Sequence, residues 1–116
     1  VKKIGSYAFY GCYGFTGILN IPNYIERIEY GTFYNCTGFT GALVIPPSVT
    51  CISDHAFNEC RSLNEISIPS SVSIIGSSAF SFCYSLKQIT IPPSVTSIGR
   101  KSFVHSNSLV QVEILW

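Results

Sequence analysis

One short pattern recurs along the whole chain at a nearly constant spacing. The stretch IPSSVSIIGSSAF (68–80) has close counterparts in IPPSVTCISDHAF (45–57) and IPPSVTSIGRKSF (91–103). The phenylalanine near the end of each stretch recurs at intervals of 24, 24, 23 and 23 residues, as Phe9, Phe33, Phe57, Phe80 and Phe103. Self-similarity with a period of about 20 to 50 residues is typical of a solenoid, in which stacked coils bury their apolar sides against one another.

Each repeat contains signals for a strand and for a turn. Ile89 and Ile91 alternate with polar residues, which predicts a half-buried strand, and Pro92 ends it because proline has no N–H for a ladder. Ser77 and Ser78 are expected to cap a short helical turn, with Ala79, Phe80 and Cys83 on one face. The first two repeats, GFTGILNIP and GFTGALVIP, are one residue longer than SLNEISIP and SLKQITIP. We expect a bulge just before the strand that leaves the core columns in register.

The pattern L-x-x-I-x-I-P-x-S-V-x-x-I-G-x-x-A-F-x-x-C resembles the leucine-rich repeats of BspA-like, or Treponema-type, surface proteins. The match is carried by Leu86, Ile89, Ile91, Pro92, Val95, Ile98, Gly99 and Phe103 and by their counterparts in the other repeats. The resemblance implies a leucine-rich-repeat right-handed superhelix. Its parallel strands would line the concave side, with short helical turns or irregular coil on the convex side. It also implies a cell-surface or secreted protein linked with adhesion to host proteins and cells.

The repeat predicts that residues 1–116 form a single array of about five repeats of 23 to 24 residues. The start, Val1-Lys2-Lys3-Ile4-Gly5, matches the middle of a repeat, as in Val95 to Gly99. We therefore expect a fragment of a longer array.

The composition argues against several classes of partner. The net charge is +1, and charged residues make up 11% of the chain, so no basic footprint for nucleic acid is present. No apolar run reaches the roughly 18 residues that would span a bilayer, and we expect no direct membrane insertion. Motifs of nucleophilic, phosphate-binding or dinucleotide-binding enzymes are absent, which predicts a non-catalytic protein without a cofactor.

Four cysteines, Cys12, Cys36, Cys60 and Cys83, occupy one column of the repeat. They could form disulfides or a metal site, or they could be free thiols that fill a fixed core position. Stacked side chains point the same way, and close C-x-x-C pairs are absent, so we favour free thiols and predict no metal. Ser106 replaces the cysteine in the last repeat.

We consider four further features for a chemical role. Cys51 lies outside the column at a variable position that we expect to be exposed, and His55 follows it four residues later. We interpret the two as an isolated surface pair rather than a catalytic dyad. His105 shares a variable position that we expect to be unconstrained.

Asn35-Cys36-Thr37 fits an N-glycosylation acceptor, which would require Asn35 to point outward. Six of the seven tyrosines either cover a surface or form a binding patch, namely Tyr7, Tyr10, Tyr13, Tyr24, Tyr30 and Tyr34.

The concave strand positions that should face solvent vary far more than the core columns do. They are Ile18, Asn20, Ala42, Val44, Glu65, Ser67, Gln88, Thr90, Gln111 and Glu113. Solenoids use such a face as an extended binding surface. We therefore expect a protein-binding module whose partner is a host or extracellular-matrix protein. The alternative is a structural spacer or an element that self-associates through the ends of the array, and an intracellular scaffold is a third reading.

Overall fold

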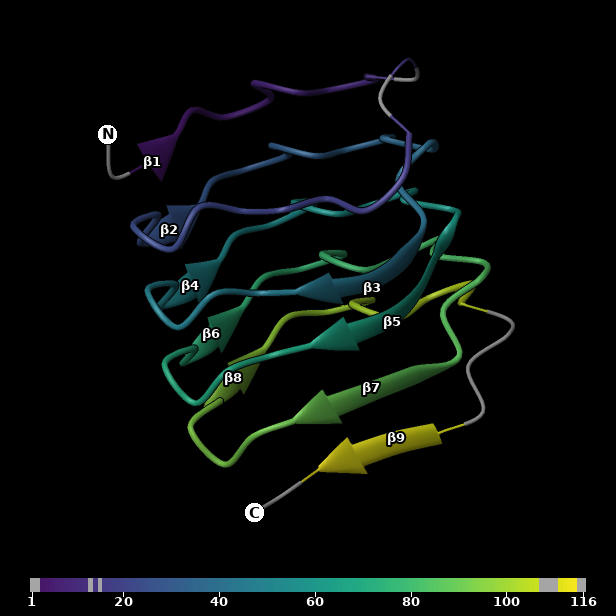
Figure 1. The fold of residues 1–116 in the computed structure, drawn as a ribbon. Coiled ribbons are helices and arrows are strands. Elements are labelled where there is room, and N and C mark those ends of the chain that lie inside the picture. Colours follow the sequence, from purple (N-terminus) through teal and green to yellow (C-terminus); the bar gives the residue numbers. More distant parts are fainter. Residues whose placement is uncertain (1–2, 13, 15, 107–110, 115–116) are drawn as a thin grey trace.

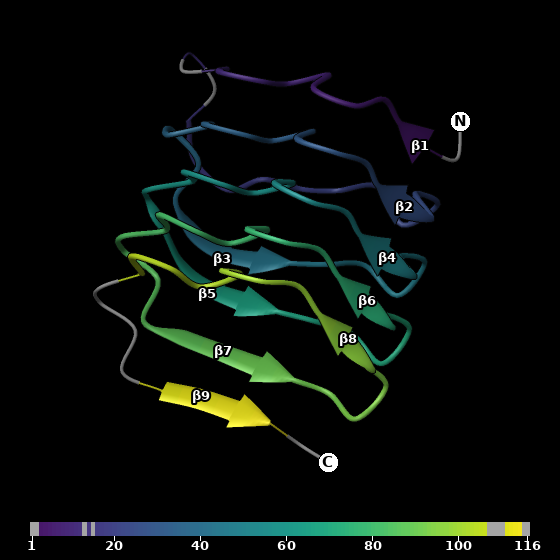
Figure 2. The ribbon, with the colours of Figure 1, turned by 180° about the vertical axis from the view of Figure 1, so that it is seen from behind.

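The chain winds into a stack of coils that carries two parallel β-sheets (Figure 1). The computed structural model describes residues 3–12, 14, 16–106 and 111–114. A five-stranded sheet of short strands has the order β1 (Lys3–Ile4), β2 (Arg27–Ile28), β4 (Cys51–Ile52), β6 (Ile74–Ile75) and β8 (Ser97–Ile98). A four-stranded sheet has the order β3 (Gly41–Val44), β5 (Leu63–Ser67), β7 (Gln88–Ile91) and β9 (Gln111–Ile114). Seen from behind, the coils follow one another in sequence order from β1 to β9 (Figure 2).

The longer strands form where apolar and polar residues alternate. In β7, Ile89 and Ile91 are buried while Gln88 is exposed, as the alternation predicts. The proline that follows β3, β5 and β7 starts a tight turn toward the next short strand. In that turn the N–H of Val95 donates to the carbonyl oxygen of Pro92 at 3.2 Å, and the same bond recurs in the preceding coils.

The side of each coil between its short strand and its long strand consists of tight turns. We call this the turn side; it comprises residues 5–12, 29–36, 53–60, 76–83 and 99–106. The helical turn expected at Ser77–Phe80 is wrong, and the irregular alternative is the one observed, because the described residues contain no helix. Two positions in every coil have φ between 56° and 65°, which is incompatible with a right-handed helix. We call them the left-handed columns: Tyr7, Gly31, His55, Ser78 and Lys101, and Gly11, Asn35, Glu59, Phe82 and His105.

Backbone hydrogen bonds on the turn side join each coil to the next. In the third coil, the N–H groups of His55, Phe57 and Glu59 donate to carbonyl oxygens of the fourth coil at 3.0, 2.9 and 2.8 Å. The equivalent alternate N–H groups of the first, second and fourth coils make the same three bonds. These hydrogen bonds satisfy backbone polar groups of the turns, although the turns belong to neither a helix nor a sheet.

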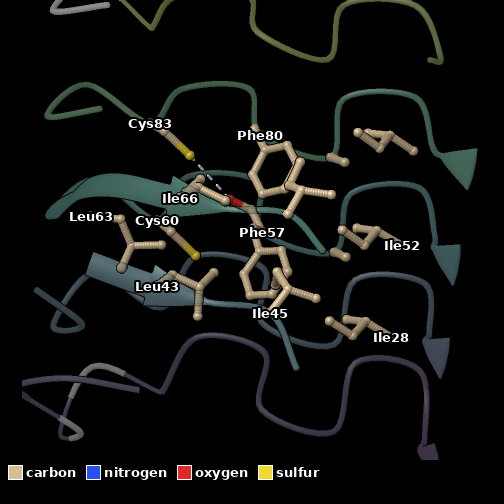
Figure 3. Close-up of a cluster of buried hydrophobic side chains, with 14 of the residues drawn as sticks. Ile28, Leu43, Ile45, Ile52, Phe57, Cys60, Leu63, Ile66, Phe80 and Cys83 are labelled. Atoms are coloured by element: carbon tan, nitrogen blue, oxygen red, sulfur yellow. Dashed lines mark hydrogen bonds between the residues drawn. The ribbon is translucent and has the colours of Figure 1, made fainter. Parts of the chain in front are cut away.

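The core consists of columns in which each side chain packs on its own copy. The five phenylalanines of the repeat stack with ring centroids 5.3 to 5.8 Å apart and interplanar angles of 10° or less. Figure 3 shows Phe57 and Phe80 from this stack beside Leu43, Leu63 and Ile66. Offset stacking at this distance is favourable beyond the burial of the rings. The predicted core columns are confirmed as a buried cluster through the middle coils, whereas Ile4, Phe9 and Phe103 are half-buried and Ile98 is 38% exposed.

The cysteine column is also a hydrogen-bond ladder. Cys60 Sγ donates to the carbonyl oxygen of Phe33 at 3.1 Å, and Cys83 Sγ donates to that of Phe57 at 3.4 Å (Figure 3). In the last coil, Ser106 Oγ donates to the carbonyl oxygen of Phe80 at 3.1 Å. Serine therefore preserves the bond of the cysteine it replaces, and the column requires a small donor rather than apolar volume alone.

The extra residue of the first two repeats is accommodated where it was expected. The register between β3 and β5 shifts between Gly41 and Ala42, and Gly41 has a φ of 77° that glycine adopts without strain. Beyond this irregularity, Leu43 pairs with Ile66, so the core columns stay in register.

Replacing Phe80 by alanine should lower the free energy of unfolding by about 3–5 kcal/mol, because it opens a cavity in the middle of the ring stack. Urea titration measures the loss. The matched control is Phe103→Ala, which removes the same side chain from a half-buried site at the end of the described stack and should cost less. An equal loss of free energy of unfolding in the two variants would contradict the view that a ring stabilises the fold more when it stacks on a neighbour at each side.

Replacing Cys83 by serine should preserve the bond to the Phe57 carbonyl oxygen, as Ser106 does one coil later. Cys83→Ala removes the donor and leaves a small void. It should therefore be less stable than Cys83→Ser by about 1 kcal/mol in urea titration. An alanine variant as stable as the serine variant would show that the column selects apolar volume instead.

Candidate functional site

The ten predicted binding positions lie on the outward side of the four-stranded sheet and on the coil segment that precedes it. We call this surface the strand face. Ala42 pairs with Glu65, which pairs with Gln88 and then Gln111; Val44 pairs in turn with Ser67, Thr90 and Glu113. Ile18, Asn20, Ala42, Val44, Glu65, Ser67 and Gln88 are exposed, and Thr90 is half-buried. The side chains of Gln111 and Glu113 lie outside the described residues. Parallel pairing therefore brings positions about 23 residues apart into two continuous ladders.

The strand face is apolar at one end. Ile18 is 65% exposed and Val44 is 62% exposed, unusually high values for aliphatic side chains. Together with Ala42, Pro46 and Pro47 they line a hollow of about 240 Å³. Such a hollow can accept an apolar side chain of a partner.

The rest of the strand face is polar. Glu65 lies beside Gln88, and Ser67 lies beside Thr90, so one ladder carries a carboxylate and an amide and the other carries hydroxyl groups. In the described part of the chain, Glu65 takes part in no ion pair. This end can therefore offer hydrogen bonds and one uncompensated negative charge to a partner.

Four of the tyrosines gather on the turn side of the first two coils. The Tyr7 ring contacts Tyr10 and Tyr30 at centroid distances of 5.7 and 5.4 Å, and Tyr10 contacts Tyr34 at 5.2 Å. Tyr7, Tyr10 and Tyr34 line an open hollow of about 650 Å³. Tyr24 is exposed elsewhere, and Tyr13 lies outside the described residues. Tyr7, Tyr10, Tyr30 and Tyr34 thus form one cluster of rings on the surface.

His55 belongs to this aromatic cluster, which sequence reasoning missed. Its ring lies 5.7 Å from that of Tyr34 in a stacked arrangement and 5.4 Å from that of Tyr30. Its Nδ1 is 3.0 Å from the side-chain nitrogen of Asn58. The signal was present in the repeat, because His55 occupies the same column as Tyr7. The pKa of Tyr34 is raised, first by burial and then by the negative charge of Glu59, so its hydroxyl stays a neutral donor.

Two expectations about single residues are wrong. Cys51 is only 8% exposed, whereas Arg27 and Ile74, which pair with it in the five-stranded sheet, are exposed. Its Sγ lies 3.9 Å from Ser53 Oγ, and no hydrogen bond joins it to His55 in the described structure. His105 is exposed but not unconstrained, since it occupies a left-handed column with a φ of 58°.

The same column explains Asn35, the candidate glycosylation site. Asn35 has a φ of 61°, which asparagine tolerates better than most residues, and its N–H donates to the carbonyl oxygen of Asn58 at 2.7 Å. The residue is half-buried. Modification at Asn35 stays a prediction.

All five cysteines are free thiols, and three of the column, Cys36, Cys60 and Cys83, are poorly suited to react. Burial raises the pKa of Cys36 to about 11 and that of Cys83 to about 12, although a backbone hydrogen bond offsets part of each shift. Burial also raises the pKa of Cys60. With these raised pKa values the thiols are protonated at neutral pH. Because the thiolate is the nucleophilic form, they are weak nucleophiles.

Among the described residues, no group of three or more His, Cys, Asp and Glu side chains could hold a metal ion. The described part also contains no helix able to cross a bilayer.

The stability of the array should fall as the pH rises above about 9. In the unfolded chain the thiols ionise near 9.0, whereas the buried thiols hold their protons up to about 11 or 12. The unfolded state therefore binds fewer protons in this window, and the free energy of unfolding decreases with pH. Urea titrations from pH 8 to about 11 measure the decrease. The control is the double variant Cys60→Ser, Cys83→Ser, which should show a smaller decrease; an unchanged slope would contradict the assignment to these thiols.

Comparison with known proteins identifies the repeat. The family model for the BspA type leucine rich repeat region matches residues 2–115 in six copies. A leucine rich repeat protein from Treponema pallidum is 33% identical with a TM-score of 0.90, over 97% of this chain and 51% of that chain. No curated protein matches the chain.

Two other solved structures are similar over almost the whole chain. A leucine-rich repeat protein from Bacteroides ovatus is 29% identical with a TM-score of 0.72, over 97% of this chain and 35% of that chain. A leucine rich cell surface protein from Faecalibacterium prausnitzii is 30% identical with a TM-score of 0.74, over 98% and 36%. The chain thus spans about a third to a half of these similar structures. It belongs to the family of BspA-type leucine-rich repeat proteins.

Proposed function

We propose that this array is a non-catalytic protein-binding module of a cell-surface protein, and that it binds a host or matrix protein through the strand face. The observation that carries the proposal is the contrast within each long strand. In β5 and β7 the buried Ile66 and Ile89 are the same residue, whereas the outward neighbours differ from coil to coil. A surface whose residues are not required by the fold is available for recognition.

The character of the strand face favours a polypeptide partner. One end offers the apolar hollow at Ile18 and Val44, and the other offers Glu65, Gln88 and Thr90 for hydrogen bonds. Protein interfaces combine an apolar centre with a polar rim in this way. The similar structure from Faecalibacterium prausnitzii is described as that of a cell surface protein, which supports the same location for this chain.

Self-association is the second candidate, and one observation favours it. An apolar hollow of about 270 Å³ lies in the coil of β1, lined by Ile4, Phe9, Leu19, Ile21, Phe33 and Phe39. Another copy could cover these side chains by stacking end to end, which would make the array a spacer. Sedimentation over a wide concentration range separates the two functions, because a spacer of this kind grows with concentration.

The triple variant Val44→Lys, Ser67→Lys, Thr90→Lys should abolish binding to a partner captured from extracellular-matrix and host-surface proteins. Three ammonium groups would cover one ladder of the strand face and prevent close contact. Calorimetry with the purified partner measures the loss, which should exceed about tenfold.

The matched control places the same three charges in the same coils on another side. Thr50, Ser73 and Thr96 are exposed and equivalent in the repeat, so Thr50→Lys, Ser73→Lys, Thr96→Lys should leave binding intact. Binding that survives the strand-face variant, or that both variants abolish equally, would refute the assignment of the partner to the strand face.

A further inference from the structure

Another hollow on the turn side, of about 480 Å³, shares Tyr34 with the hollow of the tyrosines and shares no lining residue with the hollow of the strand face. We call it the turn hollow. Its walls come from four successive coils and include Tyr34, His55, Ser78, Phe82, Lys101 and His105. Because it crosses several coils, it offers an elongated site rather than a single small pocket.

The backbone presents these side chains rigidly. His55, Ser78 and Lys101 occupy one left-handed column, and Phe82 and His105 occupy the other. The N–H groups of His55, Ser78 and Phe82 are all bonded to the following coil, at 3.0, 2.9 and 2.8 Å. The hollow therefore needs no rearrangement of its frame to receive a ligand.

Aromatic pairs contribute at both ends of the turn hollow. Tyr34 and His55 stack at a centroid distance of 5.7 Å, and Phe82 and His105 stack at 4.9 Å. Asn58 and Ser81 also line the hollow, and both are buried, so they form its polar floor. A ligand in this space meets aromatic rings at its ends and polar groups beneath it.

The charge of the turn hollow is positive on its C-terminal side. Lys101 is exposed and makes no ion pair within the described structure, and Arg100 precedes it. Two acidic residues next to the lining residues in sequence already have interaction partners. Glu59 pairs with Arg61 at 3.3 Å, and Asp54 Oδ1 accepts the N–H of Ser77 at 2.8 Å. The uncompensated lysine favours a ligand with an anionic group.

These properties together select one ligand class. We propose that the turn hollow binds an acidic saccharide, with its anionic group at Lys101 and its ring faces against Tyr34 and Phe82. A sugar ring has apolar C–H faces for the aromatic side chains and hydroxyl groups for the polar floor, and a carboxylate or sulfate supplies the charge. An acidic polypeptide would satisfy Lys101 but would make no comparable use of the aromatic rings.

Calorimetry on the full chain near 0.15 M salt tests the site with defined probes. A hyaluronan oligosaccharide carries carboxylates alone, a heparin oligosaccharide adds sulfates, and cellohexaose is neutral. We expect saturable binding of at least one acidic probe and none of cellohexaose; whichever acidic probe binds identifies the anionic group. Lys101→Gln should weaken that binding about tenfold or more. Absence of binding to both acidic probes, or equal binding of cellohexaose, would overturn the proposal.

Two matched variants distinguish this site from general attraction to a cation. Lys87→Gln removes an equal charge from an exposed residue beside β7 and should leave the affinity unchanged. Phe82→Asn removes a ring while keeping a residue that tolerates the left-handed backbone, and it should weaken saccharide binding several-fold. Circular dichroism confirms that each variant is folded.

Poly-glutamate provides the last comparison. Equal affinity for poly-glutamate, lost in Lys101→Gln but retained in Phe82→Asn, would overturn the saccharide assignment and identify a site for acidic polypeptide. Weaker binding of poly-glutamate, insensitive to Phe82→Asn, is the expected result.

Discussion

The parallel hydrogen bonding of each coil to the next is the constraint on which the rest of the structure depends. It fixes equivalent backbone atoms opposite one another, so every side chain must pack on its own counterpart. Only residues that tolerate their own copy can form a core under this condition. Phenyl rings meet it by stacking, and thiols meet it by donating to a carbonyl oxygen one coil away.

The same constraint separates the parts of the molecule that maintain the fold from the parts that can recognise a ligand. The interior columns repeat the same few side chains, while the outward positions of the strand face and the left-handed columns of the turn side carry different residues from coil to coil. The strand face combines an apolar hollow with polar ladders, and the turn hollow combines aromatic rings with a lysine. One scaffold therefore displays two chemically distinct surfaces without conflict between them.

Repetition made much of this fold predictable. Phe57 and Phe80, or Ile66 and Ile89, reveal their shared burial because they recur in equivalent places, and the alternation around Ile89 located the outward positions of the strand face. Even the bulge at Gly41 followed from counting residues.

What the sequence concealed has a physical reason in each case. Gly11, Glu59 and Phe82 share a left-handed backbone conformation, but their side chains have no property in common that would predict it. Cys51 is buried although its partners in the neighbouring coils, Arg27 and Ile74, are exposed, so its position in the repeat did not reveal its burial. His55 contacts Tyr30 and Tyr34 because the coils align across the turn side. These contacts join residues 21 or more positions apart in the sequence.

The direction of the hydrogen bonds between coils determines the order in which the coils can be completed while the chain is synthesised. Alternate N–H groups of each turn, such as those of His55, Phe57 and Glu59, donate to the coil that follows, whereas thiols and hydroxyls such as those of Cys60, Ser94 and Ser102 donate to the coil that precedes. As the chain leaves the ribosome, a new coil finds the acceptors for its side chains already in place. Its own turn amides wait for the next coil to be made. Each coil is thus completed by its successor, and the array should fold as a growing stack with one unfinished edge that advances toward the C-terminus.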